Sequence, residues 1–222
     1  MIIIIKQVVK IGGSLFPNYA IDLAKKLKST NSCIVLGGGE FANLIRKYND
    51  EQHFSEEINH WTAIDCMDII AKLVNDKVES AKLAYSIEEI NQISNEGFTP
   101  IFIVSEFLKK EDPFECSWDV TSDSIAAYVA HLLNANLLIV TNVNGIYTQE
   151  PKESGSTFIS KIDATTLLTF QESSIDVMLP SLLLEFGSDC YVVNGKFPER
   201  VMSLIDDNIN DYNFDYTQII GE

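Results

Sequence analysis

The sequence predicts an α/β protein in which helices pack on a mostly parallel central sheet. Short apolar runs rich in β-branched residues recur along the chain, and each ends in glycine or polar turn residues, as buried parallel strands do. Between these runs, apolar residues recur at helical spacing. Strands and helices that alternate in this way form an α/β sandwich. No repeat or linker interrupts the 222 residues, so a single domain over residues 1–222 is expected.

The strands are expected where β-branched residues are densest. The first is IIIIKQVVKI at the start of the chain, which runs into Gly12 and Gly13. Further strands are expected at 33–39, 99–105, 136–143 and 190–195, and helices at 18–28, 40–51, 55–78, 87–94, 122–133, 163–171 and 197–206. In such folds ligands bind at the carboxyl ends of the strands, which is where the glycine turns fall.

The composition excludes several classes of function. A formal net charge of −16 leaves no basic surface for nucleic acid or for an anionic membrane. No apolar segment has the length of a membrane span or of a signal-peptide core. The four cysteines are scattered without a CxxC pair, so neither a zinc site nor a disulfide framework is expected. A cytoplasmic location fits these features.

Lys10 is the first residue that the fold alone does not explain. It lies in an apolar strand, directly before the turn of Gly12, Gly13 and Ser14. A turn between a strand and a helix can point backbone amides at an anion, although glycine turns of this kind are more often structural. A lysine at a strand end needs a partner, and phosphate oxygens are a natural one.

Three more motifs lie at turns before helices or strands. The second motif is a glycine turn, Gly37, Gly38 and Gly39, followed by Glu40. Its backbone either approaches a ligand closely or makes a tight corner between strand and helix that Glu40 caps. Residues 117–124, SWDVTSDS, offer more caps than one helix needs, which favours Asp123 as a residue that orients a lysine or a reacting group. Residues 141–147, TNVNGIY, contain an Asn-Gly turn, which by itself does not indicate a binding site.

In their order, VKIGGS, GGGE, TSDSIAA and TNVNGIYTQEPK resemble the amino-acid-kinase superfamily over about residues 5–205. Within it, GGGEFANLIRKY, NHWTAIDCMD, SWDVTSDSIAAYVA and CYVVNGKFPERV resemble the archaeal branch that phosphorylates [5-(aminomethyl)furan-3-yl]methyl phosphate in methanofuran biosynthesis. The resemblance implies a three-layer αβα sandwich and a homo-oligomer. It also implies transfer of the γ-phosphoryl group of ATP, with Mg²⁺, to a small-molecule phosphate acceptor.

The resemblance further implies roles for individual residues. Lys10 would contact the transferring phosphoryl group, and Asp123 would position Lys10. Backbone amides of the first glycine turn would hold the nucleotide phosphates, and Lys152 would reach them too. The residues expected at the nucleotide are Gly12, Gly13, Ser14, Thr141, Asn142, Gly145, Ile146, Tyr147 and Lys152, and those expected at the acceptor include Gly38, Gly39 and Glu40. No side chain is assigned as a metal ligand.

An aminomethylfuran acceptor carries an ammonium group as well as a phosphate. Asp65 and Asp68 are three residues apart on one helical face, and a carboxylate there would hold the ammonium. Trp61 would stack on the furan ring. His60 is an alternative contact, which would hold the acceptor phosphate as in isopentenyl phosphate kinases. The alternative is that the aspartates form a solvated face of an acidic protein and that Trp61 belongs to the core.

Two departures from the family pattern leave other functions open. Ser181 stands where many relatives have a second catalytic lysine, and Asn142 and Asn144 stand where relatives commonly have aspartate. The asparagines keep the turn geometry but lose charge. The chain is therefore expected to be the furan phosphate kinase, a kinase for another acceptor such as isopentenyl phosphate or UMP, or a non-catalytic nucleotide-binding or storage protein. Intact Lys10 and Asp123 speak against the last of these.

Overall fold

A computed structural model describes residues 4–149, 153, 155–170, 174–206 and 213–221. The strands are β1 (Gln7–Ile11), β2 (Ser32–Leu36), β3 (Ala81–Ala84), β4 (Thr99–Phe102), β5 (Asn136–Thr141), β6 (Ile146–Tyr147), β7 (Phe158–Ile159), β8 (Lys161–Asp163), β9 (Cys190–Asn194) and β10 (Thr217–Ile220). The helices are α1 (Asn18–Lys26), α2 (Gly39–Gln52), α3 (Glu56–Asn75), α4 (Ile87–Asn95), α5 (Ser105–Glu111), α6 (Ser122–Leu133), α7 (Ala164–Leu167), α8 (Leu179–Phe186) and α9 (Pro198–Ile205), with a short 3₁₀ helix η1 (Gly13–Leu15).

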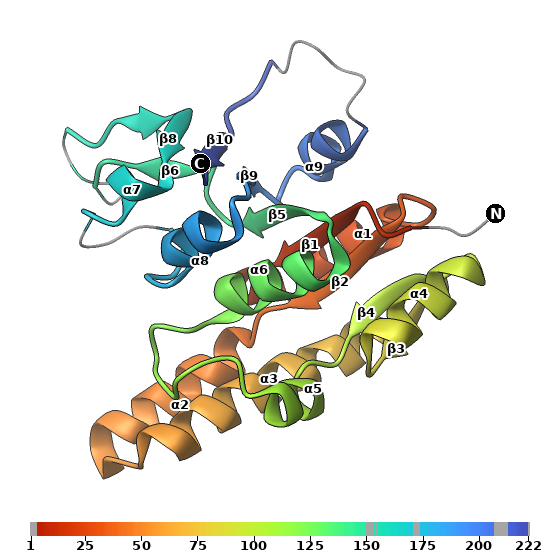
Figure 1. Ribbon diagram of the computed structural model, residues 1–222, viewed down its shortest axis with the longest axis horizontal. Helices are drawn as coiled ribbons and strands as arrows, with labels where there is room; N and C mark the ends of the chain where they lie inside the picture. Colours follow the sequence, from red (N-terminus) through yellow and green to blue (C-terminus); the bar gives the residue numbers. More distant parts are fainter. Residues whose placement is uncertain (1–3, 150–152, 154, 171–173, 207–212, 222) are drawn as a thin grey trace.

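In the described part of the chain, eight strands form one sheet in the order β3-β4-β2-β1-β5-β9-β10-β8. Neighbouring strands are parallel except β9 and β10, which are antiparallel. A separate hairpin is formed by β6 and β7. Helices flank the sheet (Figure 1). The predicted α/β sandwich with a mostly parallel central sheet is confirmed.

Strand β1 lies at the centre of the sheet and has a core on each face. Its residues alternate between the faces, as the two-residue repeat of a strand requires. Val8 packs in the core that includes α6 and α8, whereas Val9 and Ile11 pack in the core that includes α1 and α9. The same alternation places Lys10 on the α6 face. The strand therefore aims its lysine at the beginning of a helix.

Several predicted boundaries differ from the structure. The first strand begins at Gln7, and Ile4 is 67% exposed, because the described part of the isoleucine run lies outside the sheet. The strand expected at 99–105 ends at Phe102, since Ser105 begins α5. Elements β3, β8, β10, α5, α8 and the β6–β7 hairpin were not expected. Most of these are too short to show a clear period in sequence.

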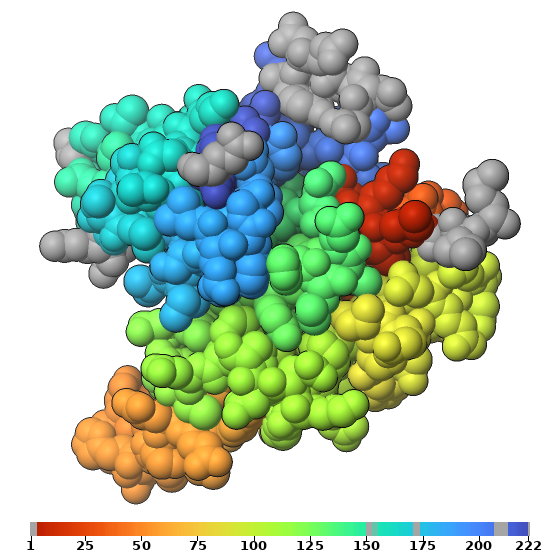
Figure 2. Space-filling model, viewed as in Figure 1, coloured from red at the N-terminus to blue at the C-terminus, as the bar shows by residue number. Residues whose placement is uncertain are grey.

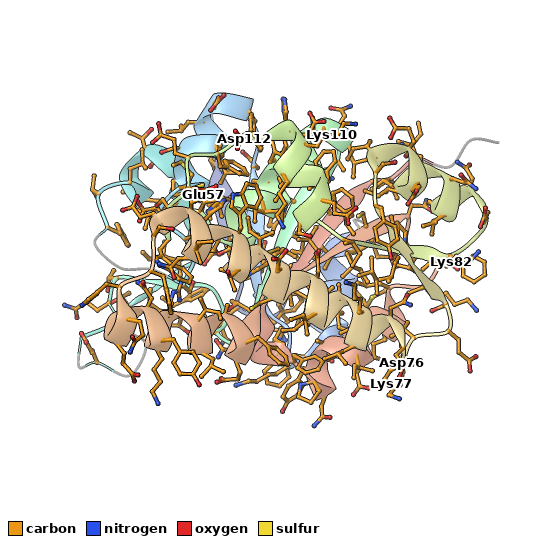
Figure 3. The ribbon with its side chains drawn as sticks, turned by 90° about the horizontal axis from the view of Figure 1, so that it is seen from below. Glu57, Asp76, Lys77, Lys82, Lys110 and Asp112 are labelled. Atoms are coloured by element: carbon orange, nitrogen blue, oxygen red, sulfur yellow. The ribbon has the colours of Figure 1, made fainter. Side chains whose placement is uncertain are left out.

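Helices α2 and α3 pack against each other, and the end of α2 with the start of α3 projects from the rest of the molecule, as the orange segment in Figure 2 shows. Ser55 caps α3 by accepting a hydrogen bond from the Ile58 amide at 3.3 Å. Figure 3 shows α3 running from Glu57 to Asp76 and Lys77, which follow its last turn. None of the helices in the described ranges is long and apolar enough to cross a membrane.

Candidate active site

Lys10 and Asp123 form a buried ion pair at the carboxyl end of β1. Lys10 lies opposite Val35 of β2 and Ile139 of β5, in the middle of the sheet. Its Nζ is 2.6 Å from Oδ1 of Asp123, and the two side chains are 9% and 6% exposed. A buried charge is costly unless it is paired, so each residue accounts for the other. The structure thus brings together the two residues that the sequence singled out as catalytic.

The two glycine turns that follow β1 and β2 pack directly against each other. A β-carbon at Gly13 would lie 2.1 Å from the amide nitrogen of Gly39, and Gly39 has a φ of +52°, which favours glycine. Close backbone packing is therefore one physical reason for both glycine runs. Gly12 differs from its expected role, because its amide donates to the Val140 carbonyl at 2.8 Å and extends the β1–β5 ladder. Gly13 and Ser14 remain to supply amides to a phosphate.

A pocket of about 450 Å³ opens between these turns and the beginnings of α2, α3 and α6. Its lining includes Asp123 and the glycine turns on one side, and His60 and Met67 of α3 on the other. Of the predicted acceptor residues, Gly38, Gly39, Glu40 and His60 line it. Within the described ranges, no group of three His, Cys, Asp or Glu side chains gathers to hold a metal ion.

Asp65 and Asp68 do not line this pocket, which corrects their expected role. Asp68 is 5% exposed and caps α5, because its carboxylate accepts from the Val104 amide at 2.9 Å and from the amide and hydroxyl of Ser105. Burial raises the pKa of the Asp68 carboxyl. Asp65 is half exposed and pairs with Lys109 at 3.2 Å. Helical spacing placed them as neighbours, but it could not show that both side chains face α5, where Asp68 caps the first turn and Asp65 pairs with Lys109 at the surface.

His60 is 4% exposed and is held by the loop that leads to α6. Its Nδ1 lies 3.1 Å from the carbonyl oxygen and 3.4 Å from the amide nitrogen of Ser117. Nε2 is therefore the ring nitrogen left for a ligand. Trp61, expected to stack on the acceptor, is outside the pocket lining and packs against the core.

Two pocket residues escaped the sequence analysis, Arg46 and Trp118. The guanidinium carbon of Arg46 lies 4.7 Å from the centroid of the Trp118 ring, and both side chains line the pocket. Arg46 is the cationic side chain of the lining, although the chain as a whole is acidic. Arg46 is seven residues beyond Gly39, two turns along α2. Only that helical spacing could have pointed to it.

Asp176 is a third residue that sequence reasoning missed. It lies in the pocket wall formed by residues 174–177, and its carboxylate reaches the start of α6. Oδ2 accepts from the amides of Thr121 and Ser124 at 3.0 Å each. Burial and the neighbouring Asp123 carboxylate raise the pKa of Asp176, and the hydrogen bonds from Ser124 and Thr121 act in the opposite sense. No local pattern marks a helix cap that comes from 52 residues away.

The segment expected at the nucleotide follows β5 at the same edge of the sheet. The side chain of Ile146 is fully buried and its amide donates to Thr217 Oγ1 at 2.8 Å, so Ile146 ties the loop to β10, and its place at a nucleotide stays a prediction. Tyr147 packs edge-to-face on Phe158, with ring centroids 5.4 Å apart. Thr141 is buried at the end of β5 and Asn142 is exposed, while Lys152 lies outside the described residues.

The loop is also tied to the opposite side of the site. Asn144 joins it to β9, α9 and the segment before β10 through three hydrogen bonds. The backbone carbonyl of Gly145 accepts a hydrogen bond from the Ser174 hydroxyl at 3.2 Å. The nucleotide segment and the pocket wall are thereby connected.

Comparison with known proteins gives a consistent picture. A sequence model of the amino acid kinase family matches residues 6–194. The [5-(aminomethyl)furan-3-yl]methyl phosphate kinase of Methanocaldococcus jannaschii is 34% identical over 226 residues, covering 97% of this chain and 98% of that protein. A uridylate kinase of the same organism is 25% identical over 207 residues, covering 85% of each. The crystal structure of uridylate kinase from Archaeoglobus fulgidus has a TM-score of 0.72 at 21% identity, covering 96% of this chain and 99% of that one, which shows the shared fold.

Proposed function

This chain belongs to the amino acid kinase family, and from that premise we propose that it transfers the γ-phosphoryl group of ATP to the phosphate of [5-(aminomethyl)furan-3-yl]methyl phosphate, giving the diphosphate used in methanofuran biosynthesis. The observation that carries this proposal is the buried Lys10–Asp123 pair beside a pocket bounded by two glycine turns. The acceptor is chosen because the relative with that activity matches the chain from end to end.

In the proposed reaction an oxygen of the acceptor phosphate attacks the γ-phosphorus of ATP. The new P–O bond forms as the bond to the β,γ-bridging oxygen breaks, and ADP leaves with that oxygen and its electron pair. The acceptor phosphate is already an anion, so no side chain has to act as a nucleophile. Mg²⁺ would arrive with ATP and would neutralise charge that develops on the phosphates during transfer.

The residues of the chain would contribute position and charge. Lys10 would place its ammonium on the oxygens of the transferring group, while Asp123 keeps that ammonium in place at 2.6 Å. The amides of Gly13, Ser14 and Gly39 would hold phosphate oxygens where the two turns meet. Fixing both substrates in line accounts for roughly 7–11 kcal/mol of a barrier of this kind.

The pocket also offers groups suited to each end of the acceptor. Arg46 and the Nε2 atom of His60 would bind its phosphate, and the Trp118 ring would face the furan. Of the carboxylates in the lining, Asp123 is paired with Lys10 and Asp176 is held by five hydrogen bonds. Glu40, exposed at the start of α2, is the carboxylate left for the ammonium group.

ADP release with Mg-ATP and a panel of acceptors tests the proposed function. We expect turnover with the aminomethylfuran phosphate and a loss of about 10²–10³-fold in kcat for Lys10→Ala. Turnover with UMP or isopentenyl phosphate alone would assign a different acceptor. ATP binding without turnover on any acceptor would make the chain a nucleotide-binding protein and remove the proposed activity.

The role of Glu40 has its own matched control. Glu40→Gln should raise KM about tenfold for the aminomethylfuran phosphate, because the ammonium group loses its counter-charge. The same substitution should leave KM unchanged for an analogue that carries a methyl group in place of the aminomethyl group. Equal changes for both acceptors would show that Glu40 does not contact the ammonium.

We further propose that the chain forms one domain, acts in the cytoplasm and assembles as a homo-oligomer. Large apolar side chains on α2 and α3 are 40–58% exposed, and they follow helical stripes: Phe41, Leu44, Tyr48, Ile58, Ile69 and Leu73. A second copy of the projecting α2–α3 pair would cover them. Light scattering coupled to gel filtration measures the mass, and a monomer at micromolar concentration would contradict this assembly.

A further inference from the structure

The Asp176 carboxylate caps two helices at once. Oδ2 accepts from the Ser124 amide in the first turn of α6 at 3.0 Å, and Oδ1 accepts from the Leu179 amide at the start of α8 at 2.8 Å. The hydroxyls of Thr121 and Ser124 also donate to it, at 2.8 and 2.6 Å. Thr121, at the N-cap position of α6, makes no cap with its own side chain. One carboxylate therefore caps both α8, which begins three residues after it, and α6, which is distant from it in sequence.

The backbone of Asp176 also contacts the Lys10–Asp123 ion pair. The Asp176 amide donates to Oδ2 of Asp123 at 3.1 Å, and Oδ1 of Asp123 lies 2.6 Å from Nζ of Lys10. Thr121 and Ser124 lie on either side of Asp123 in the sequence, and the backbone amides of both donate to the Asp176 carboxylate. The orientation of Asp123 is thus set from two directions by a single residue.

We propose that Asp176 is a positioning residue for phosphoryl transfer, which holds Asp123, and through it the Lys10 ammonium, in the place where the transferring group must lie. The residue does not touch the reacting atoms. It fixes the start of α6 with its side chain and the Asp123 carboxylate with its amide. The inference rests on the proposed function for its substrates, but the geometry of the three residues does not depend on the acceptor.

The charges of the site support a positioning role. Two carboxylates near a phosphate site would repel the substrates unless their charge is offset. Lys10 offsets Asp123. The N-termini of α6 and α8 each carry about +0.5 elementary charge, and both point at Asp176. A carboxylate can therefore lie at this position and anchor Asp123 while adding little net negative charge.

Chemical labelling of Lys10 tests the inference without any acceptor. The rate of reductive methylation of each lysine is measured by peptide mass spectrometry in wild-type protein and in Asp176→Asn. We expect Lys10 to react about tenfold faster in the variant, because its ammonium is then paired with Asp123 for a smaller fraction of the time. Lys82, which pairs with Glu96 at the surface, should react at the same rate in both proteins.

Asp163→Asn is the matched control. Asp163 also caps a helix by accepting from a threonine amide and hydroxyl, at 2.7 and 2.8 Å, but it lies at α7. This control should leave the Lys10 rate unchanged. An unchanged Lys10 rate in Asp176→Asn, or an equal increase in both variants, would overturn the inference.

The buried Cys33 thiol reports whether Asp176→Asn simply opens the fold. If Cys33 becomes reactive to a thiol reagent, Ser124→Ala decides the matter, since it removes one hydroxyl donor to Asp176 and leaves the amide donors in place. Faster labelling of Lys10 with Cys33 still unreactive would support the inference. Lys10 labelling at the wild-type rate in Ser124→Ala would overturn it.

The kinetic measurement separates this inference from the proposed function. In Asp176→Asn we expect kcat to fall about 10–100-fold while KM for ATP stays within about twofold, because only transition-state contacts of Lys10 are lost. A variant with wild-type kcat would overturn the positioning role. If wild-type protein fails to turn over the acceptor, the proposed function fails, and the labelling result still decides the role of Asp176.

Discussion

Replacing Asn144 by aspartate tests how the loop after β5 is held, and whether its departure from the family pattern has a structural cause. Oδ1 of Asn144 accepts from Nδ2 of Asn194 at 3.0 Å and from Nη1 of Arg200 at 3.3 Å. Its Nδ2 donates to Oδ2 of Asp215 at 3.1 Å. Two donors on one side and a carboxylate on the other leave only this orientation of the amide. Asparagine is the residue that satisfies all three partners.

Aspartate would keep both accepted bonds but would place an oxygen against the Asp215 carboxylate. The lost hydrogen bond is worth about 1 kcal/mol, while the repulsion from Asp215, about 1 kcal/mol where water has access, is offset by a similar attraction to the Arg200 guanidinium. We therefore expect the free energy of unfolding to fall by about 1 kcal/mol, which lowers Tm by about 2–4 °C in a chain of this length. KM for ATP should rise because the loop is expected to line the nucleotide site.

The second substitution Asp215→Asn in the same chain is the control. It restores a donor opposite the new carboxylate, so the double variant should regain most of the lost Tm and of the lost affinity for ATP. Thermal unfolding and initial-rate kinetics measure both effects. A double variant as unstable as Asn144→Asp alone would refute the argument, since the charge opposite position 144 would then not explain the asparagine.

Three further substitutions or conditions test other parts of the structure. Gly13→Ala would place a β-carbon 2.1 Å from the Gly39 amide nitrogen, so we expect a loss of about 3 kcal/mol or more in a urea unfolding curve. Asp68→Ala should lower the free energy of unfolding by about 2 kcal/mol in the same measurement, because the α5 amides lose their cap. KM for the acceptor should not change. A raised acceptor KM at normal stability would show that Asp68 contacts the acceptor after all. Burial raises the pKa of Asp68 and Asp176 above the ordinary value of 3.8, so the folded protein binds these protons more tightly than the unfolded chain does. Their contribution to stability is then fully present below pH 3.8 and is lost as the pH rises through the raised values, and Asp68→Asn should weaken this decline above pH 3.8; an unchanged slope would contradict it.

The central part of the fold could be predicted from the sequence because its signals are local. Strand β1 and its neighbours are β-branched runs that end at turns, and their buried positions admit little else. Strand β10 has only four residues, Thr217–Ile220, and joins the sheet by pairing with β9 and β8. Such a strand is specified by its partners more than by its own composition. The helix that begins at Ser105 likewise depends on Asp68, a cap 37 residues earlier.

The same distinction applies to the site. Lys10, Asp123 and Glu40 lie at strand ends or helix beginnings, where sequence order alone predicts that side chains converge. Asp176 and Arg46 could not be found in this way, since one acts on a helix that is distant in sequence and the other enters the pocket two turns along α2. Asp65 and Asp68 show the converse error. Helical spacing identifies neighbours on a helix, but it does not show which packed element that face meets.

The acidity of the chain does not conflict with a site for two polyanions. The net charge of −16 acts over the surface, and at physiological ionic strength its field decays over about 8 Å. The positive groups of the proposed site would act at contact distance: the Lys10 ammonium and the Arg46 guanidinium, together with the backbone amides of the glycine turns. Inside a partly dry pocket these interactions are several times stronger than between exposed charges. Composition therefore argues against a broad anionic partner such as nucleic acid, whereas a small phosphate compound would be recognised by a few groups whose position the fold determines.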